Sequence, residues 1–555
     1  MHSAPDLVIL NGSLLTFDPA RPRASALAIA GGTIVAVGET AEIRALAGPG
    51  TRVFDAQGGT VLPGFIDSHV HLFPGSVELD CLNIHGIGDE GTLTARVRAR
   101  AAERPEDRLI LAVQADYTVL GPGRATTRQD LDRVLPDRPL ALWAPDHHTL
   151  WANTAALRAA GILHGGTVDA GCEIVMAPDG TATGELREFG AFAPVLALSP
   201  NGGRDGAGLT TGANPVPAPT AAERAADKAA LRRGLAHCAR QGITGLHNFD
   251  GNLYQMELLA EIDAEDGLAC RVEVPLHLKS FDPLARLAEV AEMRRIASTD
   301  RLWCNRVKIF MDGVVESRTA LMLEPYPGTD HIGDAVWEAA PFAEACIRAD
   351  AMGLQISVHA IGDLAIRRTL DGFETARRAN GARDSRHRIE HIEVLHPDDL
   401  PRFAALGVVA SIQPRHAPFG GYFPPEGAGR MLHPHQIPTA YAWQAIRQSG
   451  ARVIFSTDWP VIPVDVMPTI RAAIAPLAMP EPWTDQRQSL IDTLESYTAG
   501  NAWVEFNEGR KGHLAPGMMA DVAVMSHDLE ALAPEAITEA AAVLTICDGR
   551  VTWEG

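Results

Sequence analysis

Short apolar runs bounded by turn residues mark both ends of the chain. Near the N-terminus, Ala28–Ala30 and Thr33–Val37 are joined by a Gly-Gly step, which is typical of a β-hairpin. Near the C-terminus, Val522–Met525 and Ala541–Cys547 are strand-like runs of the same kind. Because the opening stretch is too short to build a core of its own, we expect its strands to pair with those from the C-terminal end.

The central part of the chain alternates helical segments with short apolar runs. Counting the run that begins at Val61, eight such runs are predicted as strands. Eight strands alternating with helices favour a closed parallel (β/α)8 barrel, in which catalytic groups lie at the C-terminal ends of the strands. An open doubly wound sheet is the alternative, although no Gly-x-Gly-x-x-Gly turn follows the first strand. The later strands are predicted at Thr244–Asn248, Arg271–Leu276, Arg306–Met311, Gln355–His359, Arg388–Glu393, Val408–Ile412 and Arg452–Thr457.

The stretch between the first and second predicted strands, about residues 73–222, is too long for a single βα crossover. We expect an insertion that forms a lid or subdomain, with strands at Leu109–Val113 and Leu140–Trp143. Residues 201–219 within it are rich in Gly and Pro and lack periodicity, which predicts a mobile loop or linker. Gating of an active site and simple structural filling both account for such a segment.

Size, charge and cysteine usage narrow the function classes. A chain of 555 residues exceeds one hydrophobic core, so a large catalytic domain with a smaller accessory domain is expected. The net charge of -21 argues against nucleic acid or an anionic membrane surface as a partner. Seven dispersed cysteines fit reduced thiols, and no run is long enough to span a bilayer. We therefore expect a cytoplasmic protein that acts on a small molecule, with a homodimer left open.

Several predicted strands end in side chains that bind metals. His69 and His71 are two residues apart, so both imidazoles project from one face of an extended segment. An isolated pair of this kind is more often a surface feature, and a single buried histidine is more often a hydrogen-bonded core residue. If the runs are barrel strands, however, the side chains at their ends meet at one mouth. The six candidates are His69, His71, Lys308, His359, His391 and Asp458.

Lys308 lies inside an apolar run, where an unpaired ammonium carries a large desolvation penalty. A carbamate formed with carbon dioxide would turn this lysine into an anionic ligand able to bridge two divalent cations. Four imidazoles with one or two carboxylate-like groups favour zinc, with Mn²⁺, Fe²⁺ or Co²⁺ less favoured on ligand type.

These motifs together resemble the amidohydrolase superfamily, and more closely its amidohydrolase family 3 branch, which includes YtcJ-like proteins and N-substituted formamide deformylases. The resemblance extends over almost the full length of the chain. Its motifs are Leu62–His71, Asp146–Asn153, Val307–Gly313, Ser317–Ala320, Val358–Asp363, Ile389–Ile392 and Ser456–Pro460.

The resemblance implies an architecture and a metal centre. A metal-dependent TIM-type (β/α)8 barrel would occupy residues 64–505, and a small β-sandwich would combine residues 1–63 with residues 506–555. The centre would hold two divalent metals, most simply two Zn²⁺. In this arrangement His69, His71 and Asp458 hold one metal, His359 and His391 hold the second, and a carbamate on Lys308 bridges them.

The reaction implied is hydrolysis of the C–N bond of an N-substituted amide, such as a formamide or an N-acyl amine, by a metal-activated hydroxide. Asp458 would be the general base and then the general acid. Deamination or cyclic-amide hydrolysis at the same site is an alternative, which Lys308 disfavours because relatives that deaminate usually lack this lysine. A non-catalytic barrel scaffold is a second alternative, but none of the six ligands is missing.

Four further residues are candidates for substrate contact. His148 and Asn153 lie in the insertion and match a motif of the family, although a structural role explains them equally well. Arg318 follows the fourth strand and could bind a carbonyl or carboxylate, or could pair with Glu316 or Asp312. Trp459 lies beside Asp458 and could line an apolar pocket, whereas aromatic residues more often serve packing.

Overall fold

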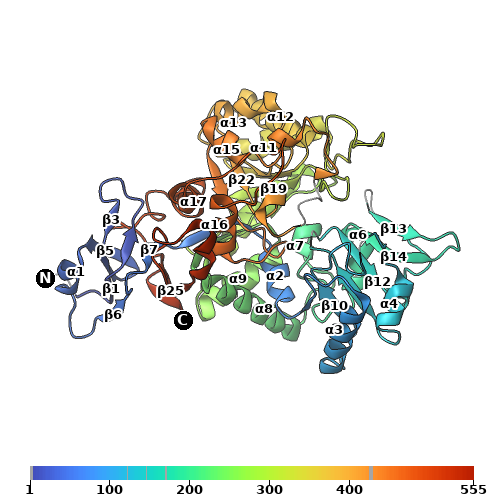
Figure 1. Cartoon of the computed structure of the whole chain (residues 1–555), viewed down its shortest axis with the longest axis horizontal. Helices are drawn as coiled ribbons and strands as arrows, with labels where there is room; N and C mark the ends of the chain where they lie inside the picture. The colour runs from blue at the N-terminus through green and yellow to red at the C-terminus, as the bar shows by residue number, and fades with distance from the viewer. Residues whose placement is uncertain (1–3, 122, 146, 169–171, 424–428) are drawn as a thin grey trace. The chain divides into compact units, whose positions relative to one another are not determined.

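The computed structural model describes residues 4–121, 123–145, 147–168, 172–423 and 429–555, and it divides into two compact units (Figure 1). Unit 1 combines Met1–His71 with Leu235–Gly555, and unit 2 comprises Leu72–Gly234. All six predicted metal ligands therefore belong to unit 1, whereas His148 and Asn153 belong to unit 2.

Unit 1 is built on short parallel strands whose residues are almost all buried. Burial on both faces explains why their sequences are continuous apolar runs rather than alternating ones. One sheet has the order β18-β16-β15-β8, and the other has the order β17-β19-β20-β21-β22-β23. The strands are β8 (Phe65–Val70), β15 (Ile243–Asn248), β16 (Arg271–Glu273), β17 (Leu276–His277), β18 (Leu302–Trp303), β19 (Arg306–Phe310), β20 (Gln355–Ala360), β21 (Arg388–His391), β22 (Val409–Ile412) and β23 (Val453–Phe455).

Short chain segments link the two parallel sheets. β16 and β17 belong to one extended run, as do β18 and β19, so each predicted strand has a counterpart in the structure. At the opposite edge, an isolated parallel bridge joins Val70 to Trp459, directly after β8 and β23. The predicted α/β class is confirmed, whereas closure of the eight strands into a complete barrel stays a prediction.

Amphipathic helices cover the parallel strands. α11 (Ala339–Ala351) and α12 (Asp363–Asn380) pack against each other and against β20, and Figure 1 shows them with α13 (Leu400–Leu406) and α15 (Trp443–Gln448) beside β19 and β22. In α12, Ile366, Leu370 and Phe373 are buried at helical spacing. The helices therefore use one apolar stripe each to shield the strands from water.

Strands from both ends of the chain pair with each other, as predicted. Leu62 lies opposite Ala523 in an antiparallel ladder between β7 (Thr60–Pro63) and β24 (Val522–Met525). This sheet has the order β26-β25-β24-β7-β2-β3, and a second sheet has the order β5-β4-β1-β6. One hydrophobic cluster draws on both sheets, including Ile9, Ile29, Val522 and Leu544. The remaining strands are β1 (Leu7–Leu10), β2 (Ser13–Leu15), β3 (Arg23–Ala24), β4 (Ala26–Ala30), β5 (Thr33–Gly38), β6 (Arg52–Asp55), β25 (Ala542–Cys547) and β26 (Arg550–Glu554).

Unit 2 has its own sheet and its own core. Its strand order is β13-β14-β12-β11-β10-β9, with β10 (Ile110–Val113) and β11 (Leu140–Trp143) at the predicted positions. Alternate residues of these strands enter two separate hydrophobic clusters, one shared with α3 (Glu90–Glu103) and the other with α6 (Phe189–Leu196). The other strands are β9 (Leu82–Asn83), β12 (Thr149–Ala152), β13 (Glu173–Met176) and β14 (Ala182–Arg187).

The Gly- and Pro-rich segment 201–219 has more structure than its composition predicts. It contains the short helix α7 (Ala207–Thr210). Arg204 also forms an ion pair with Asp227, at 2.7 Å between Nε and Oδ2. The local hydrogen bonds and this buried ion pair therefore offset the low helix propensity of glycine.

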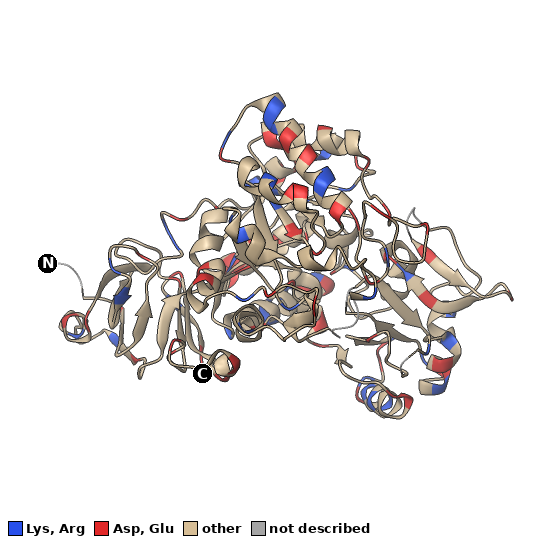
Figure 2. Ribbon diagram, turned by 45° about the horizontal axis from the view of Figure 1, so that its top comes forward, with Lys and Arg blue, Asp and Glu red and all other residues tan. Residues whose placement is uncertain are grey.

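Acidic and basic residues are interspersed along the outer helices in the view of Figure 2. Within the residues that the structure describes, every helix is too short or too polar to cross a lipid bilayer.

Candidate metal centre

His69 and His71 both direct Nε2 toward the carboxylate of Asp458. Oδ1 of Asp458 lies 3.3 Å from Nε2 of His69 and 3.2 Å from Nε2 of His71, and all three residues are buried. The two imidazoles therefore face the same way, as the spacing of two residues in a strand predicts. These three residues form one group of side chains close enough to hold a metal ion.

Backbone pairing positions Asp458 against the two histidines. Its N–H donates to the carbonyl of His69 (2.8 Å), and the N–H of His71 donates to the carbonyl of Trp459 (2.7 Å). The φ angle of Asp458 is 64°, in the left-handed region that residues other than glycine rarely adopt. This uncommon conformation is held by the pairing on either side, and such positions cluster at functional sites.

Each imidazole is held at Nδ1 by a buried carboxylate. Nδ1 of His69 lies 2.9 Å from Oε2 of Glu390, and Nδ1 of His71 lies 2.7 Å from Oδ1 of Asp250. Because a carboxylate accepts, Nδ1 carries the proton and Nε2 keeps a lone pair for a ligand. Burial lowers the pKa of His69 well below its usual range. Burial also lowers the pKa of His71, but Asp250 and Asp458 outweigh it and raise the pKa to about 9, so a cation must displace a proton there.

This group fits a divalent cation. Oδ1 of Asp458 is buried and forms no hydrogen bond among the described residues. Donor atoms that bind zinc tetrahedrally lie about 3.4 Å from one another, which is close to both separations measured from Oδ1. Two neutral imidazole nitrogens and a carboxylate are also the ligand types that zinc and similar metals prefer.

A second group of metal-competent side chains lies on the other side of the same carboxylate. Oδ2 of Asp458 is 3.9 Å from Nδ1 of His391 and 3.9 Å from Nε2 of His416. The rings of His391 and His416 are stacked, with centroids 5.9 Å apart and an interplanar angle of 7°. The carboxylate of Asp458 thus faces two different pairs of imidazoles with its two oxygens.

Lys308 projects from β19 into a buried, aromatic environment. Its Nζ lies 4.5 Å from the ring centroid of Phe249 and 4.3 Å from that of Phe310, and it forms no hydrogen bond among the described residues. Burial lowers the pKa of Lys308 to about 8, against the opposing charges of Glu390 and Asp458. A substantial fraction of the amine is therefore neutral near physiological pH.

His359 takes a different position from the other predicted ligands. It belongs to β20, and its ring centroid lies 4.5 Å from that of His391. Its Nε2, however, lies 3.0 Å from the carbonyl of Gly313, an acceptor that fixes a proton on this nitrogen. His359 belongs to neither of the two groups close enough to hold a metal ion among the described residues.

Four residues of this centre were not predicted from the sequence. Asp250 follows β15 by two residues, and His416 follows β22 by four, so both lie in loops beyond the strand ends. Glu390 lies inside a motif already noted but was not assigned a role. Gln413 orients His391, with Oε1 2.8 Å from its Nδ1. Their roles depend on contacts with residues far away in the sequence, which no local pattern reveals.

The two predicted substrate contacts in unit 1, Arg318 and Trp459, differ in exposure. Arg318 is exposed and has a φ of 61°, and its carbonyl faces Nε2 of His331 at 3.0 Å. Asp312, one of its predicted partners, instead accepts backbone N–H groups from Leu321 and Ile361. Trp459 is buried, with its ring centroid 5.8 Å from that of His237.

The two candidates in unit 2 make contacts within that unit. Nδ1 of His148 lies 3.0 Å from both carboxylate oxygens of Glu188. Asn153 is fully buried, caps α5 (Thr154–Ala159) and donates to the carbonyls of Leu135 and Arg138. These hydrogen bonds give Asn153 a structural role in unit 2. Asp146, which belongs to the same motif, lies outside the described residues.

Comparison with known proteins identifies the class of this centre. A sequence profile of the Amidohydrolase family matches residues 52–553. The putative amidohydrolase YtcJ of Bacillus subtilis (strain 168) is 26% identical, with 96% of each chain covered. The N-substituted formamide deformylase of Arthrobacter pascens is 26% identical, with 100% of this chain and 99% of that protein covered. The crystal structure of an uncharacterized metal-dependent hydrolase from Pyrococcus furiosus matches with a TM-score of 0.69 at 25% identity, covering 95% of this chain and 99% of that one.

The fold and the centre are those of a metal-dependent hydrolase that uses a divalent metal. The chain belongs to the Amidohydrolase family.

Proposed function

We propose that this hydrolase cleaves the C–N bond of an N-substituted amide, such as a formamide or an N-acyl amine. The observation that carries the proposal is the group of His69, His71 and Asp458, in which two imidazole nitrogens face a carboxylate oxygen that has no other partner among the described residues. The relative named N-substituted formamide deformylase supports this choice of substrate class.

His69, His71 and Asp458 would hold the divalent metal, which when bound lowers the pKa of water and polarises a carbonyl group. Glu390 and Asp250 keep both imidazoles oriented because each carboxylate accepts a hydrogen bond from Nδ1, which leaves Nε2 available for a ligand.

Asp458 would transfer the proton in this reaction. Burial alone would raise the pKa of Asp458, but the neighbouring imidazoles lower it below its usual range, so the carboxylate is ionised and can accept a proton. The carboxylate would take a proton from water and deliver it to the leaving nitrogen. The balanced result is one water consumed, and one carboxylic acid and one amine released.

The proposal extends to two metals and a carbamate on Lys308. A neutral amine reacts with carbon dioxide to form a carbamate and release one proton. The buried Nζ of Lys308, without a hydrogen bond among the described residues and with a pKa of about 8, supplies such an amine. With isotopically labelled bicarbonate, the native protein should give a carbamate signal by NMR, and the Lys308→Met variant should not. Absence of the signal in the native protein would refute the carbamate.

The architecture that accompanies this function is also a proposal. Eight parallel strands would close into a (β/α)8 barrel at residues 64–505, and residues 1–63 and 506–555 would form a β-sandwich. The bridge between Val70 and Trp459 supports closure, and the hydrophobic cluster shared by the two terminal sheets supports the sandwich.

A substrate panel tests the reaction class. Protein loaded with zinc or manganese is assayed with an N-alkylformamide, an anilide, an N-acyl amino acid, a cyclic amide and an aminopurine. Acid and amine should appear in equal amounts from at least one acyclic amide. Release of ammonia from the aminopurine or opening of the cyclic amide, without cleavage of any acyclic amide, would favour the alternative reactions instead.

A further inference from the structure

The loop after β22 carries a guanidinium group beside the metal centre. The first residue of this loop, Gln413, orients His391. His416 follows in the same loop, with its Nε2 3.9 Å from Oδ2 of Asp458. Arg415 lies between these two contacts in the sequence. It therefore belongs to a segment that is held against the centre on both sides of it.

The guanidinium of Arg415 is stacked on an aromatic ring but keeps unused hydrogen-bond donors. Its Cζ lies 4.7 Å from the ring centroid of Tyr422. The ring of Tyr422 packs against that of Phe423 at 5.1 Å, and Phe423 packs against His416 at 5.9 Å. Stacking occupies the face of a guanidinium and not the N–H groups in its plane. One of these groups, Nη1, is buried and forms no hydrogen bond among the described residues.

Arg415 differs from the other arginines that have a buried guanidinium nitrogen without a hydrogen bond. Among the described residues, these are Arg306 and Arg447. Nη2 of Arg306 lies 2.6 Å from Oε2 of Glu273, and Nη2 of Arg447 donates to Oγ of Ser496 at 2.6 Å. Burial lowers the pKa of Arg415 below its usual range, so its surroundings do not supply enough counter-charge to offset burial. An arginine in this situation usually has an anionic partner.

The two oxygens of Asp458 indicate which half of a substrate would approach this loop. Oδ1 faces Nε2 of His69 and His71, at 3.3 and 3.2 Å, whereas Oδ2 faces His416. In the proposed function, Asp458 delivers a proton to the leaving nitrogen. Delivery from Oδ2, the oxygen that does not face the metal-binding imidazoles, would place the amine half of the amide on the side of the loop that carries Arg415.

We propose that Arg415 binds a carboxylate on the amine half of the substrate, so that the substrates are N-acyl amino acids. This inference rests on the proposed function and narrows its substrate class. A guanidinium presents parallel N–H donors that match the two oxygens of a carboxylate. The rings of Tyr422 and Phe423 fit the hydrocarbon chain between the amide nitrogen and the carboxylate. One water is consumed, and one carboxylic acid and one amino acid are released.

Matched substrates measure this preference. N-formylglycine, N-formyl-β-alanine and N-formyl-4-aminobutyrate are each compared with the analogue in which a primary carboxamide replaces the carboxylate. The native zinc-loaded protein should favour at least one acid by about 10- to 100-fold in kcat/KM, as a hydrogen bond between charged groups predicts. In Arg415→Met the ratio should fall to about one, mainly through a higher KM for the acid. No preference in the native protein, or the native ratio in Arg415→Met, would overturn the proposal.

Two further variants separate recognition from folding. Arg447→Met removes a half-buried guanidinium that contacts Ser496, and it should keep the native preference. If Arg415→Met does not show the far-ultraviolet circular dichroism of the native protein, Arg415→Gln replaces it, because glutamine keeps polar donors but lacks the charge. An equal loss of preference in Arg447→Met would overturn a specific role for Arg415.

Binding measurements distinguish failure of this inference from failure of the proposed function. Glycine, β-alanine and 4-aminobutyrate, with their carboxamides, are titrated into the native and Arg415→Met proteins by calorimetry. Tighter binding of an acid that depends on Arg415, without hydrolysis of any amide, would support the carboxylate site and refute the reaction. Hydrolysis of amides without any difference between native protein and Arg415→Met, in binding or in the kcat/KM ratio, would refute the carboxylate site and leave the reaction standing.

Discussion

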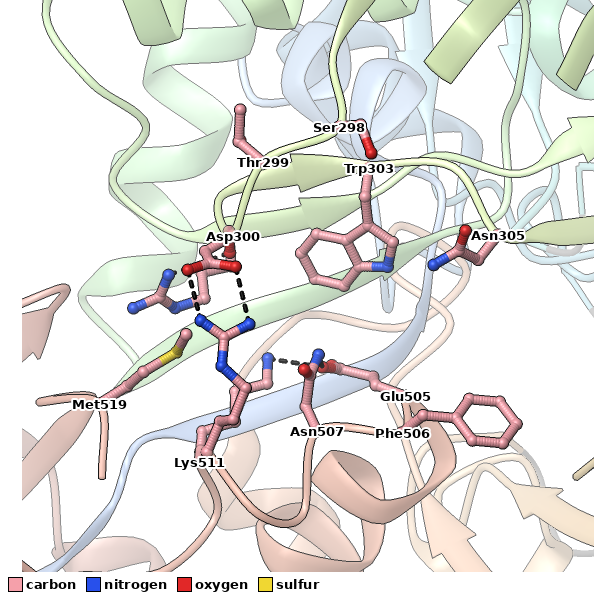
Figure 3. Close-up of a pocket in the computed structure, with 12 residues that line it drawn as sticks. Ser298, Thr299, Asp300, Trp303, Asn305, Glu505, Phe506, Asn507, Lys511 and Met519 are labelled. Atoms are coloured by element: carbon pink, nitrogen blue, oxygen red, sulfur yellow. Dashed lines mark hydrogen bonds and ion pairs between the residues drawn. The ribbon is translucent and has the colours of Figure 1, made fainter. Parts of the chain in front are cut away.

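The two ends of the parallel strands in unit 1 use charged side chains in opposite ways. At the N-terminal ends, a pocket of about 290 Å³ is lined by Asp300, Trp303, Glu505, Arg510 and Lys511 (Figure 3). Each cation there faces a carboxylate: Nζ of Lys511 lies 2.6 Å from Oε2 of Glu505, and Arg510 reaches both oxygens of Asp300. At the C-terminal ends, the carboxylate of Asp458 faces imidazoles rather than a lysine or an arginine, and Nζ of Lys308 forms no hydrogen bond among the described residues.

This difference distinguishes charged side chains that stabilise the fold from those that serve catalysis. A buried charge that faces its counter-charge contributes to a specific fold, whereas a buried amine without a counter-charge carries a cost in stability that a ligand or a reaction can offset. A pocket by itself therefore does not identify the active site. The imidazoles that converge on one carboxylate at the C-terminal ends identify it instead.

A buried chain of hydrogen bonds and ion pairs connects the two ends. Glu505 accepts from Nε2 of His247 (2.7 Å), and Arg388 donates to Nδ1 of His247 (2.9 Å). Arg388 also donates to both oxygens of Glu390, which accepts from His69. Substitutions in the pocket at the N-terminal ends of the strands should therefore affect stability first. Substitutions in the candidate metal centre at the C-terminal ends should affect catalysis first.

The largest expected effect comes from removing the metal. Dialysis against a chelator should lower turnover by about 10⁴-fold or more, because the metal supplies several kcal/mol of transition-state stabilisation. Steady-state assays before and after addition of zinc or manganese measure the loss and the recovery. Undiminished turnover in protein shown by elemental analysis to be metal-free would remove the metal from the mechanism.

Asp458→Asn should lower kcat by about 10³-fold, because an amide cannot accept and return the proton. The variant keeps an oxygen ligand, so elemental analysis should still detect metal. The matched control at the other end of the strands is Asp300→Asn, which should keep kcat within about twofold. Equal turnover in Asp458→Asn and native protein would exclude this carboxylate as the proton carrier.

Asp250→Asn should weaken metal binding by about 10- to 100-fold, because the carboxylate that orients His71 is lost. Titration with a chromophoric chelator measures the affinity. Unchanged affinity would show that backbone pairing alone orients this imidazole.

Glu505→Gln should lower the free energy of unfolding at neutral pH by about 3–5 kcal/mol, because it leaves Lys511 buried without its counter-charge. Burial alone would raise the pKa of Glu505, but Lys511 and His247 lower it to about 2. A carboxylate with a lowered pKa stabilises the fold above its unfolded-state value, near 4.5, and this contribution is lost as the pH falls toward 2. Denaturant titrations from pH 7 to pH 3 should therefore show the native protein losing its advantage over the variant, and a constant difference would contradict this explanation.

The smallest effect is expected at the exposed rim of the same pocket. Arg510→Gln removes a half-exposed ion pair with Asp300 and should change the free energy of unfolding by less than about 1 kcal/mol. Turnover should be unchanged. A large loss of activity in this variant would contradict the claim that the pocket at the N-terminal ends of the strands serves stability and not catalysis.

The strands and most of the centre could be predicted from the sequence because they depend on local patterns. Apolar runs located each parallel strand, and polar residues at the ends of those runs located His69, His71 and Asp458. His416 lies four residues beyond its strand, after a proline, and has no such signal. The pairing of Glu505 with His247 joins residues 258 positions apart, and only the folded chain brings them together.

The pairing of β7 and β8 with residues far along the chain has a consequence for synthesis. Thr457 donates its backbone N–H to Asp67 across 390 positions of sequence, and β7 pairs with β24, near the end of the chain. On the ribosome, His69 and His71 emerge long before Asp458 can reach them, and closing so long a loop is entropically costly until the intervening strands have paired. Metal capture by the complete set of ligands consequently requires that the chain has been made through Asp458 and that the intervening strands have paired.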